Sequence, residues 1–135
     1  QMLGLPFPSG KHLDNLSREA VNKDVFTVKC LELEFSLSGV QNKVQDYYVK
    51  CGNPCETAAY ALRCMAKAVC KATENALKQY PNAPVVFSGG VASNSLLRDM
   101  TARFDPVFAE PRFSTDNAMG VAILAKRAME AENGK

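Results

Sequence analysis

The sequence predicts an α/β fold with at least one parallel pair of strands. From residue 55 onward the apolar pattern gives the order helix, strand, helix, strand, helix, which is typical of strands joined by crossover helices. Residues 85–87 form an unbroken β-branched and aromatic run, as expected of a central strand covered on both faces. Gly89 and Gly90 follow this run and lead into a helix, so a strand–turn–helix unit is predicted around residues 83–98.

The first half of the chain predicts two helices and two strands. Apolar residues at helical spacing predict helices over residues 11–21 and 40–49. Strands are expected over residues 25–28 and 31–35. In the second of these, apolar side chains alternate with glutamates, which is typical of a half-exposed strand. The run that ends at Pro54 is a helix breaker.

The second half predicts a long helix over residues 56–80, followed by the central strand and two further helices. These helices are expected over residues 95–103 and 117–130, with a short strand over 107–110 between them. The lysines of the long helix fall on its other face, which we interpret as solvated. Its apolar stripe consists of Leu62, Met65, Ala66, Val69, Thr73, Ala76 and Leu77.

Composition limits the function classes. The 135 residues suffice for one domain with a core, and the net charge of +2 gives no argument for nucleic-acid binding by itself. No apolar stretch approaches the roughly 18 residues that a membrane helix needs. The five cysteines are odd in number and lack zinc-finger spacing. We therefore expect free thiols and a cytoplasmic protein, with Cys64 and Cys70 acting as small apolar helix residues.

The glycine pair has two interpretations. A strand that feeds a helix through Gly89 and Gly90 presents free N–H groups and the positive end of a helix dipole, which suit a phosphate. The alternative is a turn that needs glycine for its geometry alone, because the run is neither GxGxxG nor followed by a Walker lysine. Ser93, Asn94 or Ser95 is expected to cap the following helix.

Two other residues are candidates for chemistry. His12 is the only histidine, and no catalytic triad can be assembled around it. Asp116 lies beside the start of the last expected helix, where a carboxylate acts either as a helix cap or as a metal or nucleotide ligand. From spacing alone the cap is favoured.

Four segments resemble motifs of the tRNA threonylcarbamoyl-transferase family, whose older label is O-sialoglycoprotein endopeptidase. PVVFSGGVASNSLLR is similar to the GGVAxNxxLR motif, and GLPFPSG resembles GLPYPGG. FSLSG resembles FSFSG, and STDNAMGVAILA resembles a CTDNAAMIA-type segment. The motifs occur in the family's order over the whole chain. The resemblance covers the C-terminal half of the family, so we expect a single lobe, residues 1–135, of a longer two-lobe parent.

The resemblance implies a fold and a site. The fold is a ribonuclease-H-like lobe of the actin, Hsp70 and sugar-kinase type, a central mixed sheet flanked by helices. The implied cofactors are ATP or threonylcarbamoyl-adenylate, and one divalent ion, iron or zinc, in the full-length parent. The implied site consists of Gly10 along the nucleotide, Asp14 at the ribose, Gly89 and Gly90 at the phosphates, Asn94 hydrogen-bonded to the nucleotide, and Asp116 as third protein ligand of the ion.

The resemblance also implies partners and leaves rivals open. The implied partners are tRNA, protein subunits and the missing N-terminal lobe, and an exposed apolar face favours a homodimer. The family's HxxxH metal pair is absent from this sequence, so we expect the chain alone to be inactive. Ser9 replaces the first glycine of PGG, and Val40 begins a VQN run where many members have LKT. A non-catalytic nucleotide-binding or scaffold paralogue, and less favourably a metallopeptidase, are the alternatives.

Overall fold

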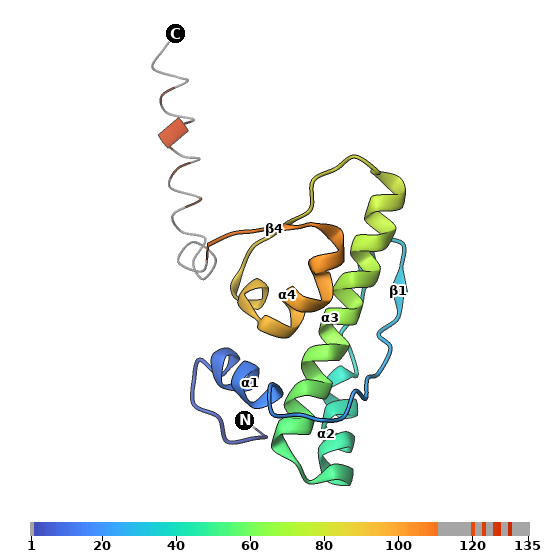
Figure 1. Cartoon of the computed structure of the whole chain (residues 1–135), viewed down its shortest axis with the longest axis vertical. Helices are drawn as coiled ribbons and strands as arrows, with labels where there is room; N and C mark the ends of the chain where they lie inside the picture. The colour runs from blue at the N-terminus through green and yellow to red at the C-terminus, as the bar shows by residue number, and fades with distance from the viewer. Residues whose placement is uncertain (1, 111–119, 121–122, 124–125, 128–129, 131–135) are drawn as a thin grey trace.

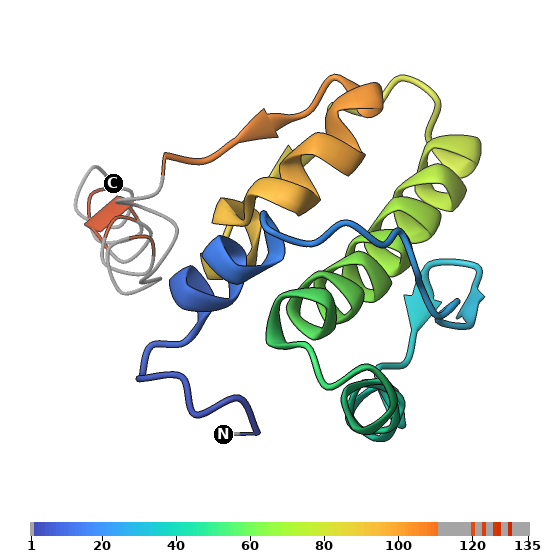
Figure 2. The same ribbon diagram turned by 60° about the horizontal axis from the view of Figure 1, so that its bottom comes forward.

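The computed structural model describes residues 2–110, 120, 123, 126–127 and 130. One long helix organises it, with two helices against one side and a small hairpin on the other (Figures 1 and 2). A fourth helix packs against its N-terminal part (Figure 2). The helices are α1 (Gly10–Ser17), α2 (Val40–Cys51), the long α3 (Pro54–Gln79) and α4 (Ser95–Thr101).

The strands form two separate pairs. β1 (Cys30–Leu31) pairs antiparallel with β2 (Glu34–Phe35). β3 (Val86–Phe87) pairs parallel with β4 (Val107–Phe108), with α4 in the crossover between them. The predicted α/β class and parallel pair are therefore confirmed. Among the described residues the strands do not join into the expected central mixed sheet; they make two two-stranded sheets.

The two strands predicted before residue 36 were wrong, for different reasons. Residues 25–28 have no regular structure. The segment lies on α3, where Phe26 N–H donates to Cys64 Sγ at 3.1 Å, so a side chain takes a backbone donor that a strand would pair. Residues 31–35 form a hairpin instead of one strand. Glu32 has φ +51 and reverses the chain, which alternation of side chains alone does not reveal.

The helix ends follow from local hydrogen bonds. Asn53 caps α3, because its side chain accepts from Cys55 N–H at 2.8 Å and Glu56 N–H at 3.2 Å, and Pro54 suits the first helical position. The first helix ends at Ser17 instead of residue 21, because Glu56 binds the backbone N–H of Val21 at 2.8 Å and draws the chain toward α3.

At the other end of the chain, α4 stops at Thr101 and continues as a 3-10 turn, Ala102–Phe104. The helix expected over residues 117–130 falls largely outside the described residues and stays a prediction. Within the part of the chain that is described, no helix combines the length and apolar character that crossing a membrane requires.

The core is built on small side chains of α3. Cys64 and Ala68 pack with Val28 and Val40, and the rings of Tyr47 and Tyr60 stack beside them with centroids 4.1 Å apart. Alanine and cysteine let neighbouring segments approach the helix closely. The apolar stripe is confirmed in its first half, where Leu62 and Ala66 are buried. Its second half, from Val69 to Leu77, lines an open groove instead.

The five cysteines are all free, and Cys64 and Cys70 are buried. Burial raises the pKa of both thiols above the ordinary value. Since only the thiolate reacts, we expect Cys51, which is exposed, to be alkylated first in the native protein at about pH 8. Cys64 and Cys70 should stay unlabelled until denaturant is added. Mass spectrometry of peptides after timed labelling measures this, and early labelling of Cys64 would contradict the described core.

Candidate functional site

The structure brings two predicted site residues, Asp14 and Asn94, into direct contact. One oxygen of Asp14, Oδ1, accepts from Asn94 Nδ2 at 2.7 Å, from Ser95 N–H at 3.1 Å and from Ser95 Oγ at 2.8 Å. The Asp14 side chain is only 13% exposed. Helix α1 is thereby fastened to the first turn of α4 at a point 80 residues away in sequence. We call these three residues the Asp14 cluster.

Asn94 has two roles in this cluster. Its amide donates to Asp14, and its Oδ1 accepts from Leu97 N–H at 2.9 Å, which makes it the N-cap of α4. Of the three residues expected to cap this helix, Asn94 is the one that does so. A substitution at Asn94 therefore affects both the helix start and the contact with α1.

The glycine pair leads directly into the cluster. Gly89 has φ +94 and ψ +165, a conformation that is open essentially to glycine only. Gly90 begins a 3-10 turn, Gly90–Ser93, which is closed by a bond from Ala92 N–H to Gly89 O at 3.0 Å. No described atom lies within 4 Å of a Cβ built at either glycine. The space beside both is open, and at Gly89 the backbone conformation itself requires glycine.

Gly10 is the first residue of α1 and lies one turn before Asp14. Residues four apart share a helix face, so Gly10 belongs to the same side of α1 as the Asp14 cluster. It is exposed, and no described atom lies within 4 Å of a Cβ built there. The structure thus gathers four of the predicted positions around the contact between α1 and the turn before α4, while Gly10 stands at the edge of this region.

The electrostatics of the Asp14 cluster favour hydroxyl groups over phosphate. The carboxylate already stands at the start of α4, where a negative charge is favourable. Its second oxygen, Oδ2, lies 3.2 Å from Arg18 Nη2. A phosphate placed against the same donors would be repelled by Asp14. A ribose hydroxyl can instead donate to Oδ2, which suits the ribose contact that the family resemblance implies for Asp14.

Three residues of this region were missing from the predicted site. Ser95 was considered only as a cap. Arg18 lies four residues after Asp14, a spacing at which opposite charges meet on a helix and which could have identified it. Arg98 donates from Nε to Ala92 O at 2.9 Å and lies over the Phe108 ring, 4.4 Å from its centroid, so it ties the 3-10 turn to β4.

The metal prediction stays a prediction. Asp116 lies outside the described residues. Within the described ranges, nowhere do three or more His, Cys, Asp and Glu side chains gather in a way that could hold an ion. His12, the only histidine, is exposed on α1. The described residues therefore do not fit a metal site by themselves.

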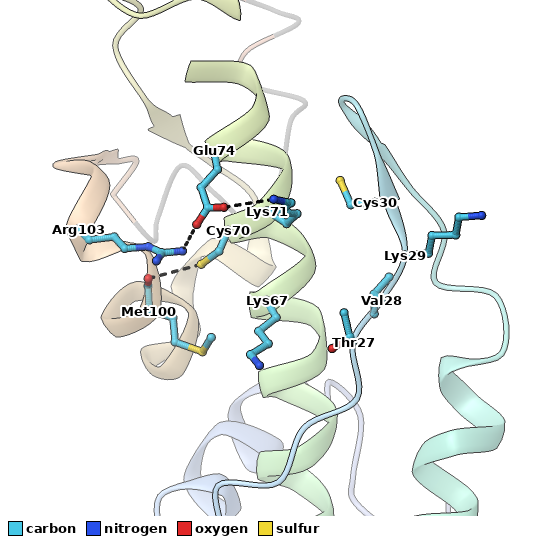
Figure 3. Close-up of a pocket in the computed structure, with 10 residues that line it drawn as sticks. All are labelled: Thr27, Val28, Lys29, Cys30, Lys67, Cys70, Lys71, Glu74, Met100 and Arg103. Atoms are coloured by element: carbon cyan, nitrogen blue, oxygen red, sulfur yellow. Dashed lines mark hydrogen bonds and ion pairs between the residues drawn. The ribbon is translucent and has the colours of Figure 1, made fainter. Parts of the chain in front are cut away.

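A separate cavity of about 590 Å³ lies over α3, between residues 27–30 and the end of α4. Figure 3 shows Glu74 between two cations, with Oε1 2.6 Å from Arg103 Nη2 and Oε2 3.7 Å from Lys71 Nζ. Lys71 and Lys67 are exposed, as the solvated-face interpretation of this helix predicts. None of the predicted site residues lines this cavity.

Comparison with known proteins agrees with the family resemblance. The family model for tRNA N6-adenosine threonylcarbamoyltransferase matches residues 1–123. A relative of that name from Streptococcus suis is 30% identical over 148 aligned positions, covering 98% of this chain and 44% of the relative. One from Anaeromyxobacter dehalogenans is 33% identical, covering 96% and 43%. The chain thus spans less than half the length of these curated relatives.

Proposed function

The chain belongs to the tRNA N6-adenosine threonylcarbamoyltransferase family, and from that premise we propose that residues 1–135 are the nucleotide-binding C-terminal lobe of a longer, two-lobe protein. The parent would transfer a threonylcarbamoyl group from its adenylate to an adenosine of tRNA. Its other partners would be protein subunits. We propose that it is located in the cytoplasm, which agrees with the five free thiols.

The observation that carries this proposal is the Asp14 cluster. It joins Asp14 to Asn94, which the family resemblance assigns independently to ribose and nucleotide, through a hydrogen bond of 2.7 Å. Gly89 and Gly90 precede the cluster in open space. The adenylate would place its ribose hydroxyls at Asp14 Oδ2 and its phosphate nearer the glycine pair, away from the Asp14 charge.

The metal remains part of the proposal for the parent only. Asp116 would be one ligand of an iron or zinc ion, beside two histidines that this sequence does not contain. Such an ion, when bound, would act as a Lewis acid toward the carbamoyl carbonyl or the phosphate. In this proposal the role of the chain is to bind and orient the nucleotide. We expect the chain alone to be inactive toward tRNA, because the sequence lacks the family's HxxxH pair.

A scaffold lobe is the second candidate, favoured by Ser9 and by the VQN run after Gly39, where the sequence departs from the family motifs. Such a lobe would bind partner subunits, or a second copy of itself, without binding nucleotide. Calorimetry separates the two proposals: a scaffold binds a partner protein and releases no heat with ATP or the adenylate.

Asn94→Ala tests the nucleotide proposal. We expect the affinity for ATP or threonylcarbamoyl-adenylate to fall at least about tenfold, because an amide that bonds the nucleotide is lost. The matched control is Asn53→Ala, which removes the cap of α3. Asn53→Ala should lose about 1 kcal/mol of stability. Asn94→Ala should lose about 2 kcal/mol, because it also removes the hydrogen bond to Asp14, but only Asn94→Ala should lose affinity. Equal affinities in the two variants, measured by titration calorimetry, would argue against the site.

A further inference from the structure

The cavity over α3 is lined by three separate segments of the chain. Figure 3 shows Met100 and Arg103 on one side of α3 and residues 27–30 on the other, with Lys67 and Lys71 of α3 between them. A solvated helix face explains two lysines that are four residues apart. It does not explain why a cation from the 3-10 turn after α4 lies beside the same space. We call this space the cationic cavity.

Positive charge is concentrated in the cationic cavity. Lys29 lines it, but the side chain points away from α3 (Figure 3). The other cations that line it are Lys67, Lys71 and Arg103, and Glu74 is the one carboxylate among the described residues of its wall. Their excess of two positive charges equals the net charge of the whole chain, so the rest of the sequence is formally neutral. A concave surface with one sign of charge attracts ions of the opposite sign.

Glu74 compensates only part of this charge. Its Oε1 lies 2.6 Å from Arg103 Nη2 and its Oε2 lies 3.7 Å from Lys71 Nζ. Lys67 forms no ion pair with any residue that the structure describes. Burial raises the pKa of the Cys70 thiol, whereas Arg103 acts to lower it, as a positive potential in the cavity would. The cavity therefore has one unpaired cation and two that share a single carboxylate.

These features define the chemistry of the ligand. The volume of about 590 Å³ is that of a small-molecule site. The described lining contains no aromatic ring on which a nucleobase could stack. A ligand must compete with Glu74 for Arg103 and Lys71, and an ion with several negative charges competes better than a monovalent one. We propose that the cationic cavity binds a small, non-aromatic molecule that carries two or more linked phosphate groups.

The ligand would connect segments that are distant in sequence. Its oxygens would accept from Lys67 Nζ and from the planar guanidinium of Arg103, whose fork of donors matches a phosphate. The Thr27 hydroxyl, which faces α3 in Figure 3, would donate to a further oxygen. Because this arrangement exists only in the folded chain, the melting temperature should rise with ligand concentration. None of these residues belongs to the Asp14 cluster, so the inference does not depend on the nucleotide proposal.

Titration calorimetry with sodium tripolyphosphate tests the inference. We expect saturable binding that Lys67→Ala weakens at least about tenfold, because a charge-assisted contact is lost. Glu74→Gln removes the competing carboxylate and should strengthen binding several-fold. The matched control is Lys78→Ala, which removes an exposed lysine of the same helix outside the cavity and should leave the affinity unchanged. Inorganic phosphate should bind more weakly than tripolyphosphate.

Four outcomes would overturn the inference. They are the absence of saturable binding, equal weakening by Lys67→Ala and Lys78→Ala, an affinity that Glu74→Gln does not raise, and binding of duplex RNA through Lys67 without binding of tripolyphosphate. The second would show diffuse attraction to a basic helix, and the last would make a nucleic-acid backbone the ligand. Because a variant that merely unfolds cannot bind more tightly, the expected gain in Glu74→Gln separates a lost contact from a lost fold.

Discussion

Replacing Asp14 by alanine is expected to lower the free energy of unfolding by about 3 kcal/mol. The substitution removes three hydrogen bonds to one carboxylate oxygen and the ion pair with Arg18. Hydrogen bonds to charged groups are worth about 1.5–3 kcal/mol each and are not additive when they share an atom. The Asn94 amide and Ser95 N–H would then lose a largely buried acceptor. Urea unfolding followed by circular dichroism measures the change.

Two controls separate the hydrogen bonds from the charge and from the helix. Asp14→Asn keeps one carbonyl acceptor and should cost about 1 kcal/mol. Asp99→Ala removes an exposed carboxylate from α4 itself and should change stability by less than about 0.5 kcal/mol. If Asp14→Ala proved as mild as Asp99→Ala, the contact between α1 and α4 would not stabilise the fold in solution.

Replacing Glu56 by alanine is the second large effect, about 2 kcal/mol of lost stability. Glu56 is buried in the first turn of α3. Its Oε1 accepts from Val21 N–H at 2.8 Å and its Oε2 from Asn22 N–H at 3.1 Å. A carboxylate near a helix N-terminus adds a further few tenths of a kcal/mol. Loss of Glu56 should therefore release the segment between α1 and the core as well as weaken the start of α3.

Backbone hydrogen exchange identifies which of these two losses occurs. Faster exchange at Val21 and Asn22 is expected in Glu56→Ala, with smaller changes in Glu56→Gln, which retains one acceptor oxygen. Glu34→Ala, an exposed position in the hairpin, is the control and should leave both amides as they are. Unchanged protection of Val21 in Glu56→Ala would mean that another contact holds this segment.

Local signals predicted the helices well. Asn53 is a favourable N-cap residue and Pro54 suits the first turn of a helix, and α3 begins at Pro54. The prediction of a strand over residues 25–28 was wrong because the structure of this segment depends on a partner that is distant in sequence. Phe26 N–H donates to the Cys64 thiol, and no pattern within residues 25–28 encodes that contact. The reversal at Glu32 is a positive φ at a residue that rarely adopts one.

The candidate site also contains features that local sequence predicts and one contact that it does not. The glycine pair and the cap at Asn94 follow from local chemistry. Position 89 requires glycine because its φ is positive. The contact between Asp14 and Asn94 joins positions 80 residues apart, and periodicity contains no information at that range. The resemblance named both residues but assigned them to a ligand. That they bind one another came from the packing of α1 against α4.

The same contact has a consequence for how the chain assembles and is degraded. A hydrogen bond that closes an 80-residue loop forms only after most of the chain has folded. The chain loses the entropy of loop closure before the contact contributes any stability. The proposed nucleotide site at the Asp14 cluster is then among the last features to form and among the first to open. A nucleotide bound at this site would stabilise the folded state. It would therefore slow proteolysis of the N-terminal segment, and the effect would grow with the occupancy of the site. The fraction of chain with an uncleaved N-terminal segment would therefore report whether nucleotide is bound at this site.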